Sequence, residues 1–351
     1  MEKRLKSIDI TRAIAMLFIV LGHTLVHSEN CSAIYKFIYS FHVILFFIIS
    51  GFTFSAKKNF FEFLKGKFLR IMIPYFIWAA LFLVPYLLFA SGVSEDLGRE
   101  TSFDLLGQIK TIFYGDFVNL MQNRPLWFLP ALFTTELIYY FVVRVSEKFP
   151  KTEIPLLITM ILVSFVAVRF LKVTLPWGLN QAIIIGWFLY LGYLMKKYNI
   201  LGKLLSVKYV LIPLFLVAGS LACYFNGTID CMTNSYQIFP LTILSSISFS
   251  FAVIFIANIV KENRLLEYIG KNTMGILIFH RIIVLLFQTK LGKITLLLNN
   301  SNIFFEFGLA VAVTAIATAL SLLANCVVKK VSPMLIGEKG VLGEWVKKIF
   351  K

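Results

Sequence analysis

Ten apolar runs, each long enough for a membrane-spanning helix, divide this sequence of 351 residues. They lie at about 10–27, 34–55, 71–90, 126–144, 154–171, 181–195, 209–224, 238–260, 273–289 and 304–328. A helix needs roughly 20 mainly apolar residues to cross a ~30 Å hydrocarbon layer. A helix in lipid also satisfies its own backbone hydrogen bonds. The runs therefore predict an all-α fold, a polytopic integral membrane helical bundle of about ten transmembrane helices.

Composition excludes the soluble alternatives. Apolar residues make up 59% of the chain, charged residues make up 15%, and 36 residues are Phe. Soluble domains average roughly 45–50% apolar and about 25% charged residues. Because a single core cannot bury this excess, we expect neither a soluble enzyme, nor a disordered chain, nor a single-pass anchor. The lipid bilayer is the first expected partner.

The basic residues predict the orientation of the chain. A formal net charge of +16 would suggest a nucleic-acid partner in a soluble protein. In a polytopic membrane protein, Lys and Arg instead concentrate in the cytoplasmic loops. With the amino terminus inside, the inner segments carry 24 Lys and Arg and the outer segments carry 8. We therefore expect no nucleic-acid partner and a multi-pass protein of the cell (inner) membrane with both termini in the cytoplasm.

The chain is expected to form one membrane domain. Residues 13–26 follow basic residues, as in a signal peptide, but they include His23 and lack a small-residue cleavage site, so we predict a retained first helix. The longest connecting segment, 91–125, has 35 residues, which is too short for a soluble domain. We expect a single transmembrane domain over 1–330 and a basic amphipathic cytoplasmic tail at 331–351, lying on the membrane surface.

Ionisable residues inside the runs are functional candidates, because a charge in lipid is costly. Arg12 and His23 lie eleven positions apart on the first predicted helix. Eleven steps of about 100° return to within ~20° of the same face, about 16 Å further along the axis. One face therefore carries a cation near the cytoplasm and an imidazole deeper in the membrane. His27 lies one turn further on, but no third ligand is evident, so we predict no metal site.

Further polar residues lie in later runs. His42 is either a satisfied structural residue or a catalytic one, and a second histidine on the adjacent helix shifts the balance toward catalysis. Glu136 has three interpretations: it orients a histidine, pairs with an arginine or bonds a neighbouring helix. His280 and Arg281 lie together in the ninth run, and helix-to-helix hydrogen bonding is the simpler interpretation of Arg281.

Five short motifs are distributed over most of these runs. They are Arg12 and His23 after Asp9; His42 with Phe46, Phe47, Ser50, Gly51 and Phe52; Arg70 with Pro74 and Tyr75; Leu126-Trp127-Phe128-Leu129; and the element from Gly270 to His280. In these motifs the chain resembles the acyltransferase type 3 membrane proteins, from Asp9 to about the tenth run. It looks most similar to stand-alone members that acetylate fucose or other sugars of surface polysaccharides.

The resemblance implies an enzyme of polysaccharide biosynthesis. Such an O-acetyltransferase moves an acetyl or other acyl group from cytoplasmic acyl-coenzyme A, its donor substrate, to a sugar hydroxyl. The carbohydrate acceptor is a glycan or a lipid-linked sugar of the cell surface or of an exopolysaccharide. We expect no soluble esterase-like domain of the kind that some relatives carry.

Roles for individual residues follow from this chemistry. Acyl transfer to a hydroxyl needs a base, an oxyanion stabiliser and a held donor. The neutral imidazole of His23 can accept the hydroxyl proton, and Arg12, His42 and Glu136 complete the expected catalytic set. Coenzyme A is polyanionic, so we assign its binding to the inner cations Arg12, Lys57, Lys58, Lys65, Lys67 and Arg70. Positive-inside topology alone would also produce this charge run.

The acceptor is expected to enter from the outer side. We assign its binding to Arg124, Trp127, Tyr75 and His280, with the stretch of Phe103, Phe113 and Tyr114 available to stack on a sugar. Two routes stay open: His23 acts as a base in direct transfer, or it is itself acylated and passes the group on. The alternative class is a proton-coupled transporter or a polysaccharide-export membrane protein without acyl chemistry, because intramembrane His, Arg and Glu also form proton relays.

Overall fold

The computed structural model describes residues 6–25, 30–96, 105–116, 120, 123–260, 262–297, 302–338 and 340, and for 85–96 and 289–297 it describes the backbone. Within these ranges the regular elements are helices. One isolated β-bridge, between Asp230 and Ser235, lies outside the helices. His27, Phe103 and most of the expected tail lie outside the described residues.

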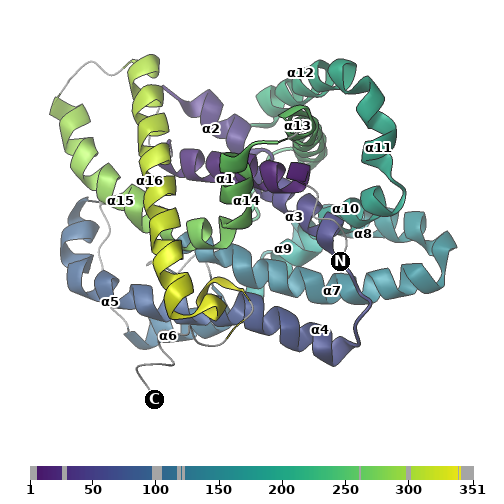
Figure 1. Ribbon diagram of the computed structural model, residues 1–351, viewed down its shortest axis with the longest axis horizontal. Coiled ribbons are helices and arrows are strands. Elements are labelled where there is room, and N and C mark those ends of the chain that lie inside the picture. The colour runs from purple at the N-terminus through teal and green to yellow at the C-terminus, as the bar shows by residue number, and fades with distance from the viewer. Residues whose placement is uncertain are drawn as a thin grey trace.

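Figure 1 shows the arrangement of the α-helices. Their bounds are α1 (Lys6–Thr24), α2 (Ser32–Tyr39), α3 (His42–Thr53), α4 (Phe60–Lys67), α5 (Ile73–Asp96), α6 (Leu105–Tyr114), α7 (Phe128–Lys148), α8 (Glu153–Phe170), α9 (Leu179–Ile184), α10 (Trp187–Lys197), α11 (Ile200–Leu204), α12 (Lys208–Asn226), α13 (Phe239–Val260), α14 (Arg264–Lys271), α15 (Thr273–Leu297) and α16 (Ile303–Val331). A π-helical turn, η1 (Phe68–Met72), joins α4 to α5. The 3₁₀ turns are η2 (Arg124–Trp127), η3 (Pro150–Thr152), η4 (Pro176–Gly178), η5 (Leu205–Val207) and η6 (Pro333–Ile336).

The helices confirm the predicted fold class. In the described part of the chain, 8 helices are long and apolar enough to cross a membrane, and the number rises to 10 when each of two bent pairs forms one span. Each of the ten overlaps one of the predicted apolar runs, although some begin earlier, such as Phe60–Val84 against 71–90. The bent pairs are α9 with α10, preceded by η4, at 58°, and α14 with the first part of α15 at 83°. The chain is therefore a multi-pass membrane protein.

The break between α14 and α15 has a local cause at Asn272. Its side-chain Nδ2 donates to the carbonyl of Tyr268 at 2.7 Å, and side chains of this type compete with the helical hydrogen-bond ladder. Its Oδ1 accepts hydrogen bonds from Asn325 Nδ2 at 2.8 Å and from Lys329 Nζ at 2.7 Å, both on α16. These bonds from α16 fix the bend that hydropathy alone does not indicate.

The first helix lies in the centre of the bundle. In Figure 1 it is crossed by α14 and α16, and it packs against α3, α13, α14, α15 and α16. A second close crossing joins α3 to α10, where a Cβ on Gly51 would lie 1.9 Å from the carbonyl oxygen of Leu189. Only glycine permits this approach. The glycine of the Ser-Gly-Phe motif therefore allows the close packing of α3 on α10.

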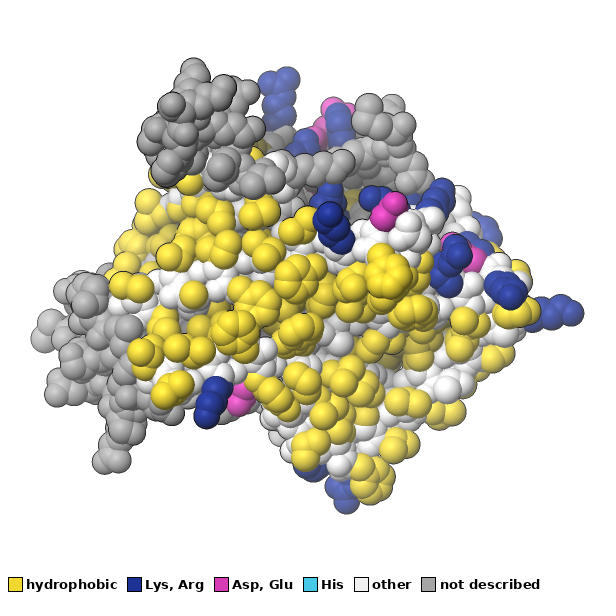
Figure 2. Space-filling model, turned by 90° about the horizontal axis from the view of Figure 1, so that it is seen from below, with side chains coloured by type: hydrophobic (Ala, Val, Ile, Leu, Met, Phe, Trp, Pro, Cys, Tyr) yellow, Lys and Arg dark blue, Asp and Glu magenta, His cyan; other side chains and the backbone are white. Residues whose placement is uncertain are grey.

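The outer surface is apolar over the spans. Figure 2 shows one face on which apolar side chains form a broad expanse, with Lys and Arg concentrated toward its upper and right-hand edges. On α8 and α12 such residues are largely exposed, as at Phe170 (75%) and Tyr224 (82%). A surface of this kind is stable against lipid chains.

The start of the expected tail packs against the bundle. Trp78 Nε1 donates to the carbonyl of Leu335 at 2.8 Å, and η6 contacts both α5 and α16. The turn η6 therefore packs the start of the expected tail against α5 and α16. The remainder of the predicted amphipathic tail, except for Gly340, lies outside the described residues.

Candidate active site

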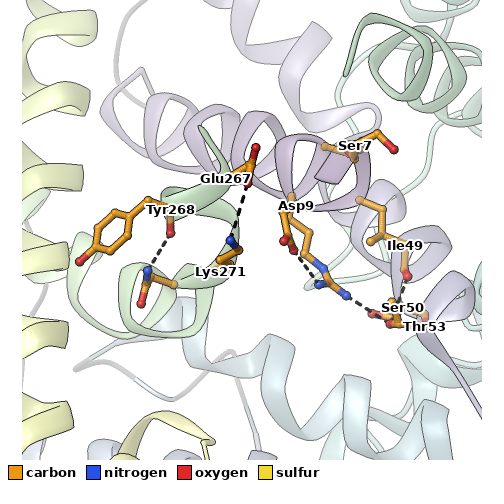
Figure 3. Close-up of polar contacts among 11 residues, drawn as sticks. Ser7, Asp9, Ile49, Ser50, Thr53, Glu267, Tyr268 and Lys271 are labelled. Carbon is orange, nitrogen blue, oxygen red and sulfur yellow. Dashed lines mark hydrogen bonds and ion pairs between the residues drawn. The ribbon is translucent and has the colours of Figure 1, made fainter. Parts of the chain in front are cut away.

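Arg12 joins the beginning of α1 to the end of α3. Its Nη1 lies 3.5 Å from Asp9 Oδ1, and its Nη2 donates to Thr53 Oγ1 at 3.2 Å. Figure 3 shows Asp9 and Thr53 on either side of this guanidinium group. Gly270 of α14 lies against the backbone here, because a Cβ on it would come within 1.8 Å of the Asp9 carbonyl oxygen. Three residues of the sequence motifs, Asp9, Arg12 and Gly270, therefore meet at one end of α1.

Three histidines meet at the other end of α1. The rings of His23 and His280 have centroids 5.2 Å apart, with an interplanar angle of 40°. Tyr39 lies between His23 and His42, with ring centroids 6.5 Å and 4.8 Å from theirs. Spans one, two and nine thus each contribute one histidine to this group, which we name the histidine cluster (His23, His42 and His280).

Hydrogen bonds orient two of the three rings. His42 Nδ1 lies 2.8 Å from the carbonyl of Ile38, and His280 Nδ1 lies 2.8 Å from that of Ile276. A carbonyl oxygen can only accept, so both Nδ1 atoms carry hydrogen and each neutral ring keeps a lone pair on Nε2. His42 (6% exposed) and His280 (0%) are buried, whereas His23 is partly exposed. Within the cluster, His23 is therefore the ring best placed to meet a substrate.

Gln288 holds the backbone of His23. Its Nε2 donates to the His23 carbonyl at 2.9 Å, while its Oε1 accepts from Arg281 Nη1 at 3.2 Å. Both residues belong to α15. Sequence reasoning missed Gln288 and Tyr39, although an amide inside the ninth apolar run and a tyrosine three positions before His42 were signals that could have identified them.

Glu136 does not contact the histidine cluster. Its Oε1 accepts a hydrogen bond from Lys67 Nζ at 2.6 Å, and Lys67 also lies 5.4 Å from the ring centroid of Phe63. The carboxylate is buried, and its Oε2 has no hydrogen-bond partner among the described residues. We therefore correct the interpretations of Glu136 as an orienting group for a histidine or a partner of an arginine, because its partner is a lysine of the expected donor segment.

The expected donor residues lie between α3 and α5. Lys57, Lys58, Lys65 and Arg70 are exposed, and Lys67 is partly buried by its ion pair. Asn59 caps α4 by accepting from the backbone nitrogen of Glu62 at 2.9 Å. We name residues 57–70 the lysine-rich segment. It begins four residues after Thr53, the residue that Arg12 contacts, so Arg12 and the start of this segment lie at the same end of α3.

Two expected acceptor residues lie beside α15. Arg124 and Trp127 form η2, which packs against α15, and the neighbouring Asn123 donates through Nδ2 to the carbonyl of Ile278 at 2.8 Å. This contact lies two residues before His280. Arg124, Trp127 and His280 therefore belong to neighbouring elements, but Trp127 (7% exposed) and His280 (0%) are buried.

Tyr75 has a different environment. Its side chain is fully buried (0% exposed), and its hydroxyl donates to the carbonyl of Ile112 at 2.8 Å. This bond anchors α6 against α5. We therefore correct the assignment of Tyr75 to the acceptor site, because its polar atom is used inside the protein.

Burial raises the pKa of the Cys231 thiol, in the loop between α12 and α13, to about 12, so this thiol stays protonated and unreactive. No group of three or more His, Cys, Asp or Glu in the described ranges is arranged to hold a metal ion.

Comparison with known proteins identifies the family. The family described as an acyltransferase domain matches residues 5–324, which include the whole of α1, the histidine cluster and most of α16. Comparisons with curated proteins and with solved structures found no match. A match over nearly the whole chain is sufficient to assign it. The protein belongs to the acyltransferase type 3 family and is a membrane-embedded acyltransferase.

Proposed function

We propose that this protein is an O-acetyltransferase that moves an acetyl group from cytoplasmic acetyl-coenzyme A to a hydroxyl of a cell-surface or exopolysaccharide sugar. The observation that carries this proposal is the arrangement of α1. Arg12, at one end, shares the end of α3 with the lysine-rich segment, and His23, at the other end, lies in the histidine cluster. One helix thus joins a cationic region to a candidate base.

Charge supports the assignment of the donor. The phosphates of coenzyme A require cations, and Lys57, Lys58, Lys65 and Arg70 are exposed close in sequence to the contact between Arg12 and Thr53. The pantetheine arm is long and thin, so it suits passage along α1 toward His23. The acceptor sugar then approaches from the side of Arg124 and Trp127.

The histidine cluster supports the chemistry. His23 accepts the proton of the sugar hydroxyl while that oxygen attacks the thioester carbonyl. The carbon–oxygen bond forms, the carbon–sulfur bond breaks, and the proton passes from His23 to the departing sulfur. In the second route a His23 nitrogen attacks the thioester carbonyl, the carbon–sulfur bond breaks, and coenzyme A leaves as a thiolate. The sugar oxygen then attacks the acetyl group on His23, the carbon–nitrogen bond breaks, and the hydroxyl proton passes to the released imidazole. Trapping an acetyl group on His23 after rapid acid quench would select the second route.

Family membership favours this enzyme over a transporter or an export protein. The decisive experiment incubates the purified full-length protein with radiolabelled acetyl-coenzyme A and polysaccharide from cells that lack the gene. We expect label on the polysaccharide and an equal amount of free coenzyme A. Mass spectrometry of surface glycans with and without the gene identifies the acceptor. Coenzyme A that neither binds nor reacts would exclude the proposed donor.

A further inference from the structure

We propose that His280 is a positioning residue for His23, and that its Nε2 accepts a hydrogen bond from the His23 ring when His23 holds the transferred proton. This inference rests on the proposed function, in which His23 is the base. It gives His280 a role in the chemistry of His23 in place of the acceptor contact expected from the sequence.

The first support is the approach of the two rings. Their centroids lie 5.2 Å apart, and the planes are inclined by 40°. At this separation, ring nitrogens on facing edges are within reach of a hydrogen bond, and the tilted arrangement is not that of two stacked rings. The two side chains come from spans one and nine, so the tertiary fold creates this pair.

The second support is the state of the His280 ring. Its Nδ1 bonds to the Ile276 carbonyl and therefore holds the hydrogen. Its Nε2 is a buried acceptor with no hydrogen-bond partner among the described residues, and the whole residue is 0% exposed. An unpartnered buried polar atom in a native protein calls for an explanation. A partner that acquires a second N–H only during the reaction, as His23 does, supplies one.

The third support is the attachment of α15 to α1. Gln288 Nε2 binds the carbonyl of His23 at 2.9 Å, and Gln288 lies two turns beyond His280 on α15. Helix α15 therefore contacts His23 twice: Gln288 binds its backbone carbonyl, and His280 lies beside its ring. Such two-point attachment fixes the distance between the rings.

The fourth support is the absence of a competing acceptor. In the described part of the chain, the ionisable groups that act on the His23 ring are His280, Arg281 and His42, and none of these is a carboxylate. In serine hydrolases a buried carboxylate orients the catalytic histidine and stabilises its protonated form. Here the neutral Nε2 of His280 is placed to do so, while its own Nδ1–H stays on Ile276. His280 neither gains nor loses a proton in the cycle.

The experiment uses the full-length protein in detergent, acetyl-coenzyme A, and polysaccharide from cells that lack the gene, with release of the coenzyme A thiol as the readout. His280→Leu removes the acceptor atom and should lower kcat about 10- to 100-fold, the range seen when a partner that orients a functional histidine is removed. KM for acetyl-coenzyme A should stay unchanged. His280→Gln retains a side-chain acceptor and should recover most of the lost kcat.

The control is Val284→Ala, one turn further along α15 at a position that is also 0% exposed. It removes packing without removing a polar atom, so it should retain kcat near that of the wild type. Wild-type kcat in His280→Leu would overturn the proposal. So would equal losses in folded His280→Leu and His280→Gln, because a purely structural role predicts no rescue.

A second measurement is independent of activity. Nitrogen-15 NMR of the histidine rings in the full-length protein should show His280 with hydrogen on Nδ1. After acidification protonates His23, the His23 ring signals should change with His280→Leu. Unchanged His23 signals in that variant would refute the contact even if the enzyme is active. Failure of the wild type to release coenzyme A would instead refute the proposed function.

Discussion

Lys67 Nζ lies 2.6 Å from Glu136 Oε1, so one of the six cations assigned to coenzyme A is already paired with a buried carboxylate. The Glu136 side chain is 7% exposed and that of Lys67 is 28% exposed. A phosphate that binds Lys67 must compete with Glu136. Lys67 is therefore the member of the donor segment whose removal should affect the fold as well as binding.

Replacing Lys67 by Met should destabilise the protein. Removing one partner of a buried ion pair leaves an uncompensated charge and costs about 3–5 kcal/mol, and the partial exposure of Lys67 places the expected loss toward the lower end. Glu136→Gln should cost less, because water can still reach the remaining lysine. Thermal unfolding of the purified protein measures both. Lys65→Met, exposed on the same helix, is the control, and equal melting temperatures for Lys67→Met and the wild type would contradict the prediction.

Replacing Arg12 by Ala should weaken donor binding. A charge-assisted hydrogen bond contributes roughly 1.5–3 kcal/mol, which corresponds to about 10- to 150-fold in affinity. Titration calorimetry with acetyl-coenzyme A measures the change, and Arg144→Ala, an exposed site at the end of α7, should leave affinity unaltered. Unchanged affinity in a folded Arg12→Ala protein would remove Arg12 from the donor site.

Replacing His23 by Ala should abolish acyl transfer. General base catalysis contributes roughly 10²- to 10⁴-fold, and the bond from Gln288 to the backbone carbonyl of His23 does not depend on the imidazole. Donor affinity and melting temperature should stay near their wild-type values. Near wild-type transfer by His23→Ala would end the catalytic interpretation of α1, and His42 or His280 would become the next candidate base.

Replacing Gly51 by Ala should disrupt the crossing of α3 and α10. The new Cβ would lie 1.9 Å from the carbonyl oxygen of Leu189, a backbone atom that cannot move alone. Overpacking of this kind costs about 1–3 kcal/mol or more. Gly66→Ala is the matched control, because nothing lies within 4 Å of its Cβ position. That change should stabilise α4 by up to about 1 kcal/mol, and the same loss of stability in both variants would refute the packing argument.

Both termini should lie in the cytoplasm. The 24 to 8 distribution of basic residues predicts this side, and an even number of spans places both ends on the same side. Reporter fusions after Lys58 and after Lys351 should both give cytoplasmic signals. A periplasmic signal at either position would reverse the sidedness on which the donor and acceptor assignments depend.

The sequence predicts the spans, because hydrophobicity decides which segments enter lipid. It also predicts that Arg12 and His23 lie on one helix, because helical periodicity is a local property. The sequence does not predict that His23 lies close to His280, because the two are 257 positions apart and only the packing of α1 on α15 brings them together. The same limit explains Glu136 and Tyr75. The sequence shows a carboxylate at Glu136 and a hydroxyl at Tyr75 within apolar runs. It does not show their partners, Lys67 and Ile112, because these lie on other helices.

The two attachments of α1 restrict how it can move. Arg12 is bonded to Thr53 on α3 at one end, and the carbonyl of His23 is bonded to Gln288 on α15 at the other. A turn of α1 about its own axis would break both bonds at once, because the two neighbours lie on different helices. The two attachments therefore restrain rotation of α1 about its own axis, so the His23 ring keeps its place beside His280.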